Sequence, residues 1–236
     1  MKVFKVLSIV IFLLIPCFTY GTSSDVVKCP KPPKDQPVVN YFLTSFTDAG
    51  ENLQNYIPRD LVLINKKDTY NEGNYCLRKP VYDAFKRMNN AMKLKTGMSL
   101  KIRSGFRSYN VQVNFKKIYG NLAADPGRSE HQLGTAIDII GGTPGEKLLD
   151  SKEYVWLQKN AAKYGFVQSY PDERIEEVES IDTTKNPNIV IEQKPDLKNG
   201  EAWHWRYIGE ETAIKIPKSM KLGEYLNKVK LNKENK

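Results

Sequence analysis

The chain is poor in residues that bind metals or form disulfides, since its 236 residues include only two histidines and three cysteines. No dense basic run is interleaved with aromatics, so we expect no nucleic-acid partner. Internal repeats and a regular strand–helix–strand rhythm are also missing. The hydrophobic share of 40% and the aromatic share of 11% are typical of globular proteins and exclude disorder or a membrane bundle.

The first residues have the pattern of an export signal. The basic stretch Met1–Lys5 is followed by an apolar run, Val6–Ile15, that is too short to span a bilayer comfortably. We interpret residues 1–21 as a signal peptide cleaved after Gly21, with an uncleaved N-terminal anchor as the alternative. A lipoprotein site at Cys17 is disfavoured because proline precedes it. We expect an exported protein, whether periplasmic, cell-wall-associated or secreted, with no transmembrane domain in the mature chain.

Loss of this segment leaves two cysteines and a basic chain. Cys29 and Cys76 are then an even pair in an oxidising compartment, which favours a disulfide worth about 4 kcal/mol, with two free buried thiols as the alternative. The formal net charge falls from +9 to +7, because only Lys2 and Lys5 are lost. Such a charge suits attraction to anionic polymers such as a cell wall, or simple solubility.

The apolar patterns predict one α+β domain with a small antiparallel sheet flanked by helices. We expect an extended arm over residues 22–40, a domain over 41–230 and a basic tail over 231–236. Residues 172–199 are polar and resemble an insertion, either a lid or a surface excursion. Helices are expected at 77–93, 110–118 and 152–163, strands at 61–64, 99–103, 135–140 and 202–208, and a weaker helical pattern at 211–229.

The two histidines stand in unusual surroundings. His131 lies in a glycine-flanked, turn-prone stretch, and His204 lies between two tryptophans. Asp138 sits within the apolar run Ala136–Ile140, where an ionised carboxylate is costly unless a cation meets it. Two histidines and one aspartate are a donor set that zinc accepts while keeping one position open. Each residue alone is more often structural, but together they favour one bound metal.

Glu201 is the candidate general base, since it lies three residues before His204. Strict strand alternation would place these two side chains on opposite faces, so a bulge or an irregular strand entry is required. The alternative is an exposed loop carboxylate.

These residues form a two-part motif. Ser-x-His-x-x-Gly-x-Ala-x-Asp over Ser129–Asp138, followed by Glu-x-Trp-His-x-Arg over Glu201–Arg206, resembles the VanY-like D-alanyl-D-alanine carboxypeptidase family of LAS-type zinc peptidases. The likeness covers about residues 50–228 and includes Ser104–Tyr109, Gln112 and Tyr56–Val62. Ala202, where proline is usual, and the segment 172–199 depart from the family pattern.

The resemblance implies the LAS-type fold, one Zn²⁺ per chain on His131, Asp138 and His204, and Glu201 as the base. It assigns Arg107 to the substrate's terminal carboxylate or the developing oxyanion. A guanidinium recognises a carboxylate through two parallel hydrogen bonds, and a structural ion pair is the alternative role. Ser129 and Gln112 match positions that contact the terminal residue.

The resulting hypothesis is a monomeric zinc carboxypeptidase that removes the C-terminal D-alanine from peptidoglycan stem peptides, with either D,D- or L,D-specificity. One rival is an endopeptidase on the same scaffold, which would have an open groove rather than a pocket closed behind Arg107. The other is a non-catalytic, zinc-stabilised cell-wall-binding module, which would not need Glu201.

Overall fold

The computed structural model describes residues 27–42, 44, 53–141, 148–170, 201–217 and 220–234. The predicted signal peptide and the segment 172–199 therefore lie outside the described residues. Among the helices described, none has the length and apolar character needed to cross a membrane.

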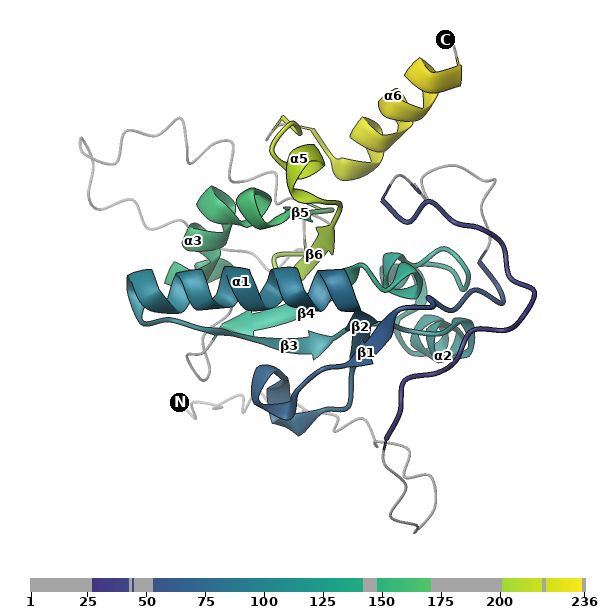
Figure 1. Ribbon diagram of the computed structural model, residues 1–236, viewed down its shortest axis with the longest axis horizontal. Helices are drawn as coiled ribbons and strands as arrows, with labels where there is room; N and C mark the ends of the chain where they lie inside the picture. Colours follow the sequence, from purple (N-terminus) through teal and green to yellow (C-terminus); the bar gives the residue numbers. More distant parts are fainter. Residues whose placement is uncertain are drawn as a thin grey trace, which may run out of the picture.

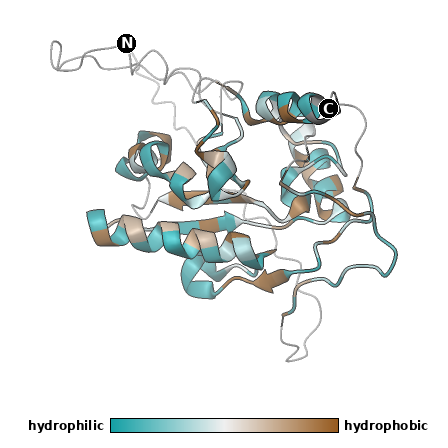
Figure 2. Cartoon of the chain, turned by 45° about the horizontal axis from the view of Figure 1, so that its top comes forward, coloured by the Kyte–Doolittle hydropathy of each residue, from teal (hydrophilic) through white to brown (hydrophobic). Residues whose placement is uncertain are grey.

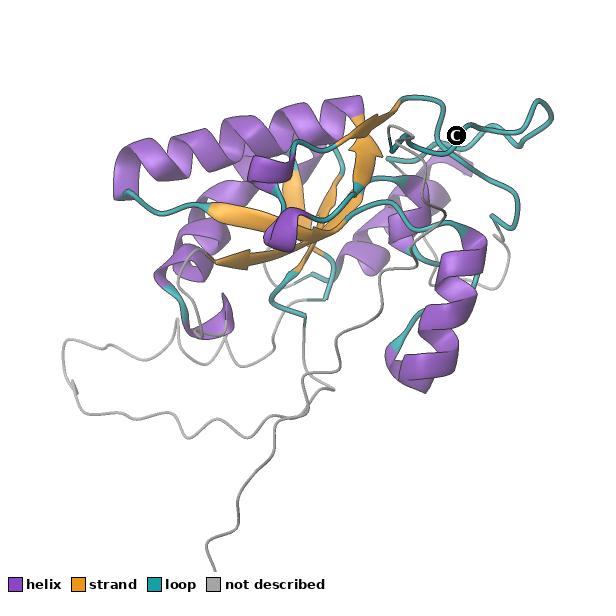
Figure 3. Ribbon diagram, turned by 90° about the horizontal axis from the view of Figure 1, so that it is seen from below, coloured by secondary structure: helices purple, strands orange, loops and turns teal. Residues whose placement is uncertain are grey.

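The centre of the protein is a four-stranded antiparallel sheet in the order β3-β4-β6-β5 (Figures 1 and 3). Its strands are β3 (Leu100–Ser104), β4 (Ala136–Gly141), β6 (His204–Tyr207) and β5 (Phe166–Gln168). A separate two-stranded antiparallel sheet pairs β1 (Leu61–Leu63) with β2 (Cys76–Arg78). The architecture confirms the expected α+β class and the small antiparallel sheet.

Helix α1 (Lys79–Thr96) covers one face of the central sheet. Hydrophobic and hydrophilic residues mix along it (Figure 2), as expected of an amphipathic helix with one buried side. Pro80 occupies its first turn, and Gly97, with φ of 73°, ends it. Its buried side chains pack against alternate residues of β3, β4 and β6, namely Leu100, Ile102, Ile137, Ile139, Trp205 and Tyr207. The intervening residues of these strands are free to build a site on the other face.

The other α-helices in the described part of the chain are α2 (Tyr109–Tyr119), α3 (Lys152–Asn160), α5 (Glu210–Ala213) and α6 (Leu222–Glu234). Most predicted elements are confirmed with small boundary shifts, but two predictions were wrong in part. Leu77 belongs to β2 rather than to the first helix, because it pairs with Val62. The last strand begins at His204 rather than Ala202, because a turn precedes it. Helix α6 runs into the stretch predicted as a tail.

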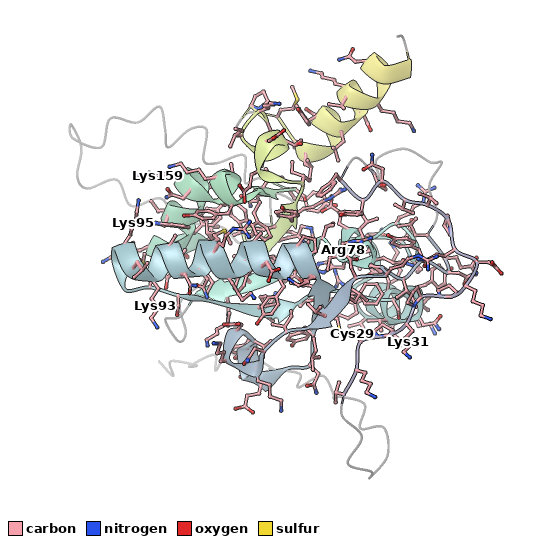
Figure 4. The ribbon with its side chains drawn as sticks, viewed as in Figure 1. Cys29, Lys31, Arg78, Lys93, Lys95 and Lys159 are labelled. Carbon is pink, nitrogen blue, oxygen red and sulfur yellow. A yellow bond between two sulfur atoms is a disulfide. The ribbon has the colours of Figure 1, made fainter. Side chains whose placement is uncertain are left out.

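Residues 27–42 and 44 form an arm that contacts the domain at several places. Cys29 and Cys76 are joined by a disulfide, as predicted. The Gln36 side chain accepts a hydrogen bond from the Ile57 backbone N–H, and the Tyr41 ring lies 3.7 Å from the Arg78 guanidinium. Arg78 lies at the start of α1, near the region of Cys29, whereas Lys93 and Lys95 lie at the opposite end of the helix (Figure 4).

Candidate metal centre and active site

The three predicted metal ligands come together on the sheet face opposite α1. Asp138 of β4 and His204 of β6 are direct cross-strand partners, and their chain neighbours Ile137 and Trp205 point into the core. His131 is supplied by a 3-10 turn, Glu130–Leu133, that precedes β4. All three side chains are buried. Two strands and one tight turn therefore converge on one point.

The ligand atoms form a nearly equilateral triangle. His204 Nδ1 lies 3.1 Å from Asp138 Oδ1 and 3.2 Å from His131 Nε2, and His131 Nε2 lies 3.2 Å from Asp138 Oδ1. Donors bound at 2.0–2.1 Å to a tetrahedral zinc lie about 3.3 Å from one another. The triangle therefore has the size of one face of a zinc coordination tetrahedron, and the donor set fits this ion.

The other nitrogen of each histidine ring is held by a partner. His131 Nδ1 lies 2.7 Å from the Gly105 carbonyl oxygen, and His204 Nε2 lies 2.8 Å from Glu130 Oε2. When each ring is neutral, as in a metal-bound site, an N–H donated to each oxygen leaves a lone pair on the nitrogen that faces the triangle. Glycine is required at position 105, because a Cβ there would lie 2.5 Å from the Cys76 carbonyl oxygen.

Glu130 and Arg206 belong to the site, although sequence reasoning gave them no role. Glu130 accepts hydrogen bonds from His204, from Ser169 Oγ at 2.6 Å and from Arg206 Nη1 at 2.9 Å. Arg206 is fully buried and also donates to the backbone carbonyls of Tyr41 and Thr44. Both residues lie inside the motif. Glu130 directly precedes His131, and Arg206 lies two residues after His204. That adjacency was the signal that could have revealed them.

Electrostatics keep the carboxylates beside the histidines ionised. Burial opposes ionisation, but the charges of Arg206 and His204 hold the pKa of Glu130 well below its usual range. Burial likewise opposes ionisation of Asp138, and the neighbouring histidines hold its pKa down. Burial lowers the pKa of His131 to about 4. At His204 burial opposes protonation, but the hydrogen bonds to Asp138 and Glu130 raise the pKa to about 10. Metal binding requires neutral imidazoles, so it must release a proton from this ring.

Glu201 reaches the triangle through a turn. The His204 N–H donates to the Glu201 carbonyl oxygen at 2.9 Å, and the Glu201 N–H donates to the Tyr170 carbonyl at 3.0 Å. This turn places Glu201 Oε2 3.9 Å from His204 Nδ1, the nitrogen that faces the triangle. It is the irregular strand entry that the sequence required. Burial raises the pKa of the Glu201 carboxyl, as suits a group that accepts and returns a proton.

Arg107 lies between β3 and α2 and is partly buried. Its guanidinium lies 4.4 Å from the Phe115 ring centroid, and its buried Nε has no hydrogen-bond partner among the described residues. Within the same ranges no carboxylate forms an ion pair with it. Burial lowers its pKa, while the charges of Asp138 and Glu201 oppose that shift. The structural ion pair considered for Arg107 finds no partner here, and the guanidinium keeps donors for a ligand.

Gln112 and Ser129 are both buried. In the sequence, Gln112 lies five residues after Arg107 and Ser129 lies two residues before His131. Gln112 lies in the first turns of α2, where its Nε2 donates to the Ala124 carbonyl at 2.8 Å. Its Oε1 is buried without a partner in the described part of the chain, so Gln112 offers an acceptor. Ser129 directly precedes the turn that carries His131. Contact of either residue with a substrate remains a prediction.

Comparisons with known sequences agree with the motif. A family model for D-alanyl-D-alanine carboxypeptidase, VanY, matches residues 74–182. YodJ of Bacillus subtilis strain 168, provisionally named a carboxypeptidase, is 35% identical over 195 residues, or 75% of this chain and 63% of YodJ. A D-alanyl-D-alanine carboxypeptidase of Enterococcus faecium is 29% identical over 189 residues, or 76% of this chain and 55% of that protein. The chain thus spans less than two thirds of these relatives' length.

Two solved structures are similar in fold. One is the LD-carboxypeptidase LdcB, whose structure reveals the molecular basis of peptidoglycan recognition. It matches with a TM-score of 0.53 at 30% identity and covers 74% of this chain and 80% of LdcB. VanYB, solved in complex with D-alanine-D-alanine, matches with a TM-score of 0.52 at 26% identity, covering 80% of this chain and 98% of VanYB.

Proposed function

Because the chain belongs to the VanY-like D-alanyl-D-alanine carboxypeptidase family, we propose that it is a zinc-dependent carboxypeptidase that removes the C-terminal D-alanine from peptidoglycan stem peptides. The observation that carries the proposal is the buried triangle of His131, Asp138 and His204, with Glu201 beside it. Arg107, which has no ion-pair partner among the described residues, lies close enough for its charge to act on this site. A binding module would need the triangle but neither of the other two residues.

The proposed mechanism divides the work among these side chains. His131, Asp138 and His204 would hold one zinc ion. When bound, zinc supplies Lewis acidity and lowers the pKa of a water molecule to near neutrality. Glu201 takes a proton from the attacking water and delivers it to the leaving amine.

Arg107 recognises the substrate's end. Its guanidinium binds the free C-terminal carboxylate and so places the last peptide bond, rather than an internal one, beside Glu201. Stacking on Phe115 restricts the rotamers of Arg107 without using its hydrogen-bond donors. An endopeptidase would have no use at this position for a partly buried cation that has no ion-pair partner among the described residues. Gln112 and Ser129 complete the pocket for the terminal residue.

The proposal includes export, since stem peptides lie outside the cytoplasmic membrane. The basic mature chain suits an anionic cell wall. All five residues with assigned roles in metal binding and catalysis come from one chain, so we propose a monomer.

The test is to incubate the mature, zinc-loaded protein with defined tetrapeptide and pentapeptide stems and to weigh the products. Loss of one terminal alanine supports the proposal, and the preferred stem separates L,D- from D,D-specificity. Cleavage at an internal bond would replace it with the endopeptidase. A zinc-loaded protein that cleaves neither stem would contradict it.

A further inference from the structure

We propose that Glu130 is a positioning residue that selects the ring nitrogen through which His204 binds the metal; this inference rests on the metal site of the proposed function. An imidazole can bind a metal through either nitrogen, and the hydrogen bond made by the other nitrogen sets the choice. At His204 that other nitrogen is Nε2, and its partner is Glu130 Oε2 at 2.8 Å.

Among the described residues, every hydrogen-bond partner of the Glu130 carboxylate is a donor. Oε2 accepts from His204 and from Ser169, and Oε1 accepts from Arg206. Both oxygens of Glu130 thus accept hydrogen bonds, which separates it from Glu201, and we assign Glu130 no part in moving substrate protons. Its work is to keep the proton of His204 on Nε2 and so to leave the Nδ1 lone pair facing Asp138 and His131.

The position of Glu130 is itself fixed by Arg206. This arginine has only donors, is fully buried, and is held by the carbonyl oxygens of Tyr41 at 3.1 Å and Thr44 at 2.7 Å. Whatever side chain stands at position 130 must therefore present an acceptor to Arg206. The N-terminal arm is thus connected to the metal ligand His204 through the side chains of Arg206 and Glu130.

The arrangement makes the nearly isosteric change Glu130→Gln informative. A glutamine that turns its oxygen to Arg206 must turn its NH₂ group toward His204. Two donors cannot face each other, so Nε2 becomes the acceptor and the ring proton moves to Nδ1, which then cannot bind zinc. His131 is an internal reference, because its partner is the Gly105 backbone carbonyl and no side-chain change removes it.

The experiment measures zinc affinity by chelator competition and records nitrogen NMR spectra of zinc-loaded protein labelled with ¹⁵N-histidine. The chain has only two histidines, so every histidine signal belongs to the described site. Wild type should show one ring bound through Nδ1 and the other through Nε2. In Glu130→Gln we expect zinc affinity to fall about 10–100-fold and the Nδ1-bound signal to disappear, with the His131 signal unchanged.

Ser169→Ala is the matched control, since it removes a hydrogen bond to the same Oε2 but leaves an acceptor for His204. It should retain the wild-type nitrogen pattern. Wild-type affinity and Nδ1 binding in Glu130→Gln would overturn the inference. If that variant does not fold, Glu130→Ala replaces it: mixed binding through both His204 nitrogens supports the inference, and the wild-type pattern contradicts it. Absence of zinc binding in wild type would instead refute the proposed function.

Discussion

Two glutamates beside His204 have opposite surroundings, and this difference assigns their roles. Glu130 accepts three hydrogen bonds, and the charges of Arg206 and His204 hold its pKa low, which disfavours it as a proton acceptor. Glu201 makes no such side-chain hydrogen bond in the described part of the chain, and burial raises its pKa. A base must exchange protons during turnover, so only Glu201 suits that role.

We therefore expect Glu201→Gln to retain zinc and to lower kcat by at least about a hundredfold, the low end of general-base contributions. The amide keeps the size of the side chain but cannot take a proton. Metal content and steady-state kinetics on the same preparation check this. A variant with full metal content and near-normal turnover would show that the base is another group.

Arg107 offers a test of substrate recognition at the same scale. If its guanidinium binds the terminal carboxylate, amidation of the substrate and the change Arg107→Ala each remove one partner of one pair. Each should cost roughly 2–5 kcal/mol of transition-state binding, because the remaining charge is left unpaired. The two losses should not add, since they disrupt the same interaction. The measurement is kcat/KM for free-acid and amidated stems with both proteins.

Arg107→Lys is the matched variant and should recover only part of the activity, because an ammonium group cannot form the two parallel bonds of a guanidinium. Additive losses in the cycle would make Arg107 a structural support. Full activity of wild type on the amide would point to an endopeptidase.

Among the elements that carry no metal ligand, the arm over residues 27–42 and 44 is connected to the site by hydrogen bonds. Its carbonyls at Tyr41 and Thr44 hold Arg206, and Arg206 holds Glu130. At the other end of the arm, the disulfide joins Cys29 to Cys76 of β2. The Cys76 carbonyl oxygen accepts a hydrogen bond from the Phe106 N–H at 2.7 Å. The neighbouring Gly105 carbonyl orients His131. The arm thus contacts residues that orient both histidines. For His204 the connection runs through Arg206 and Glu130, and for His131 it runs through β2 and the Gly105 carbonyl.

Loss of the disulfide should destabilise the protein. Replacing Cys29 and Cys76 together with alanine should lower the free energy of unfolding by about 4 kcal/mol, because a 47-residue separation is no longer closed in the unfolded chain. Urea denaturation of oxidised wild type, reduced wild type and the double variant measures this. The last two should agree, and equal stability of all three would show that the bridge has no effect on folding.

For the whole molecule, we expect the core to form without the metal. Helix α1 and the sheet bury a continuous cluster on the face away from the triangle, including Phe85, Met88, Ile137 and Trp205. Structural zinc is needed mainly where a small domain lacks such a core. The site is therefore carried by a scaffold that can fold around it.

Removing zinc with a chelator should abolish activity and leave far-UV circular dichroism nearly unchanged, and added zinc should restore activity at one ion per chain. Metal analysis of the active protein, dialysed before assay, provides the stoichiometry. Active protein without zinc would refute the cofactor assignment, and unfolding on chelation would give the metal a structural role as well.

The sequence by itself determined which functional groups were available to form a site. These are two histidines, an aspartate in an apolar strand, a glutamate three residues before one of the histidines, and two cysteines that can form one disulfide. It also determined the α+β class, because apolar periodicity is a local property of each segment. The same local reading assigned Leu77 to a helix, since a three-residue strand beside an amphipathic helix has no periodicity of its own.

Only the tertiary structure decided how these groups are used. The turn at Glu201 depends on a backbone hydrogen bond to Tyr170, and the role of Glu130 depends on donors from Ser169, His204 and Arg206. Arg107 is distinguished by the absence of a described ion-pair partner, which only packing can reveal. A hydrogen bond or ion pair between residues distant in sequence depends on where the fold brings their atoms, and residue order alone does not contain that distance.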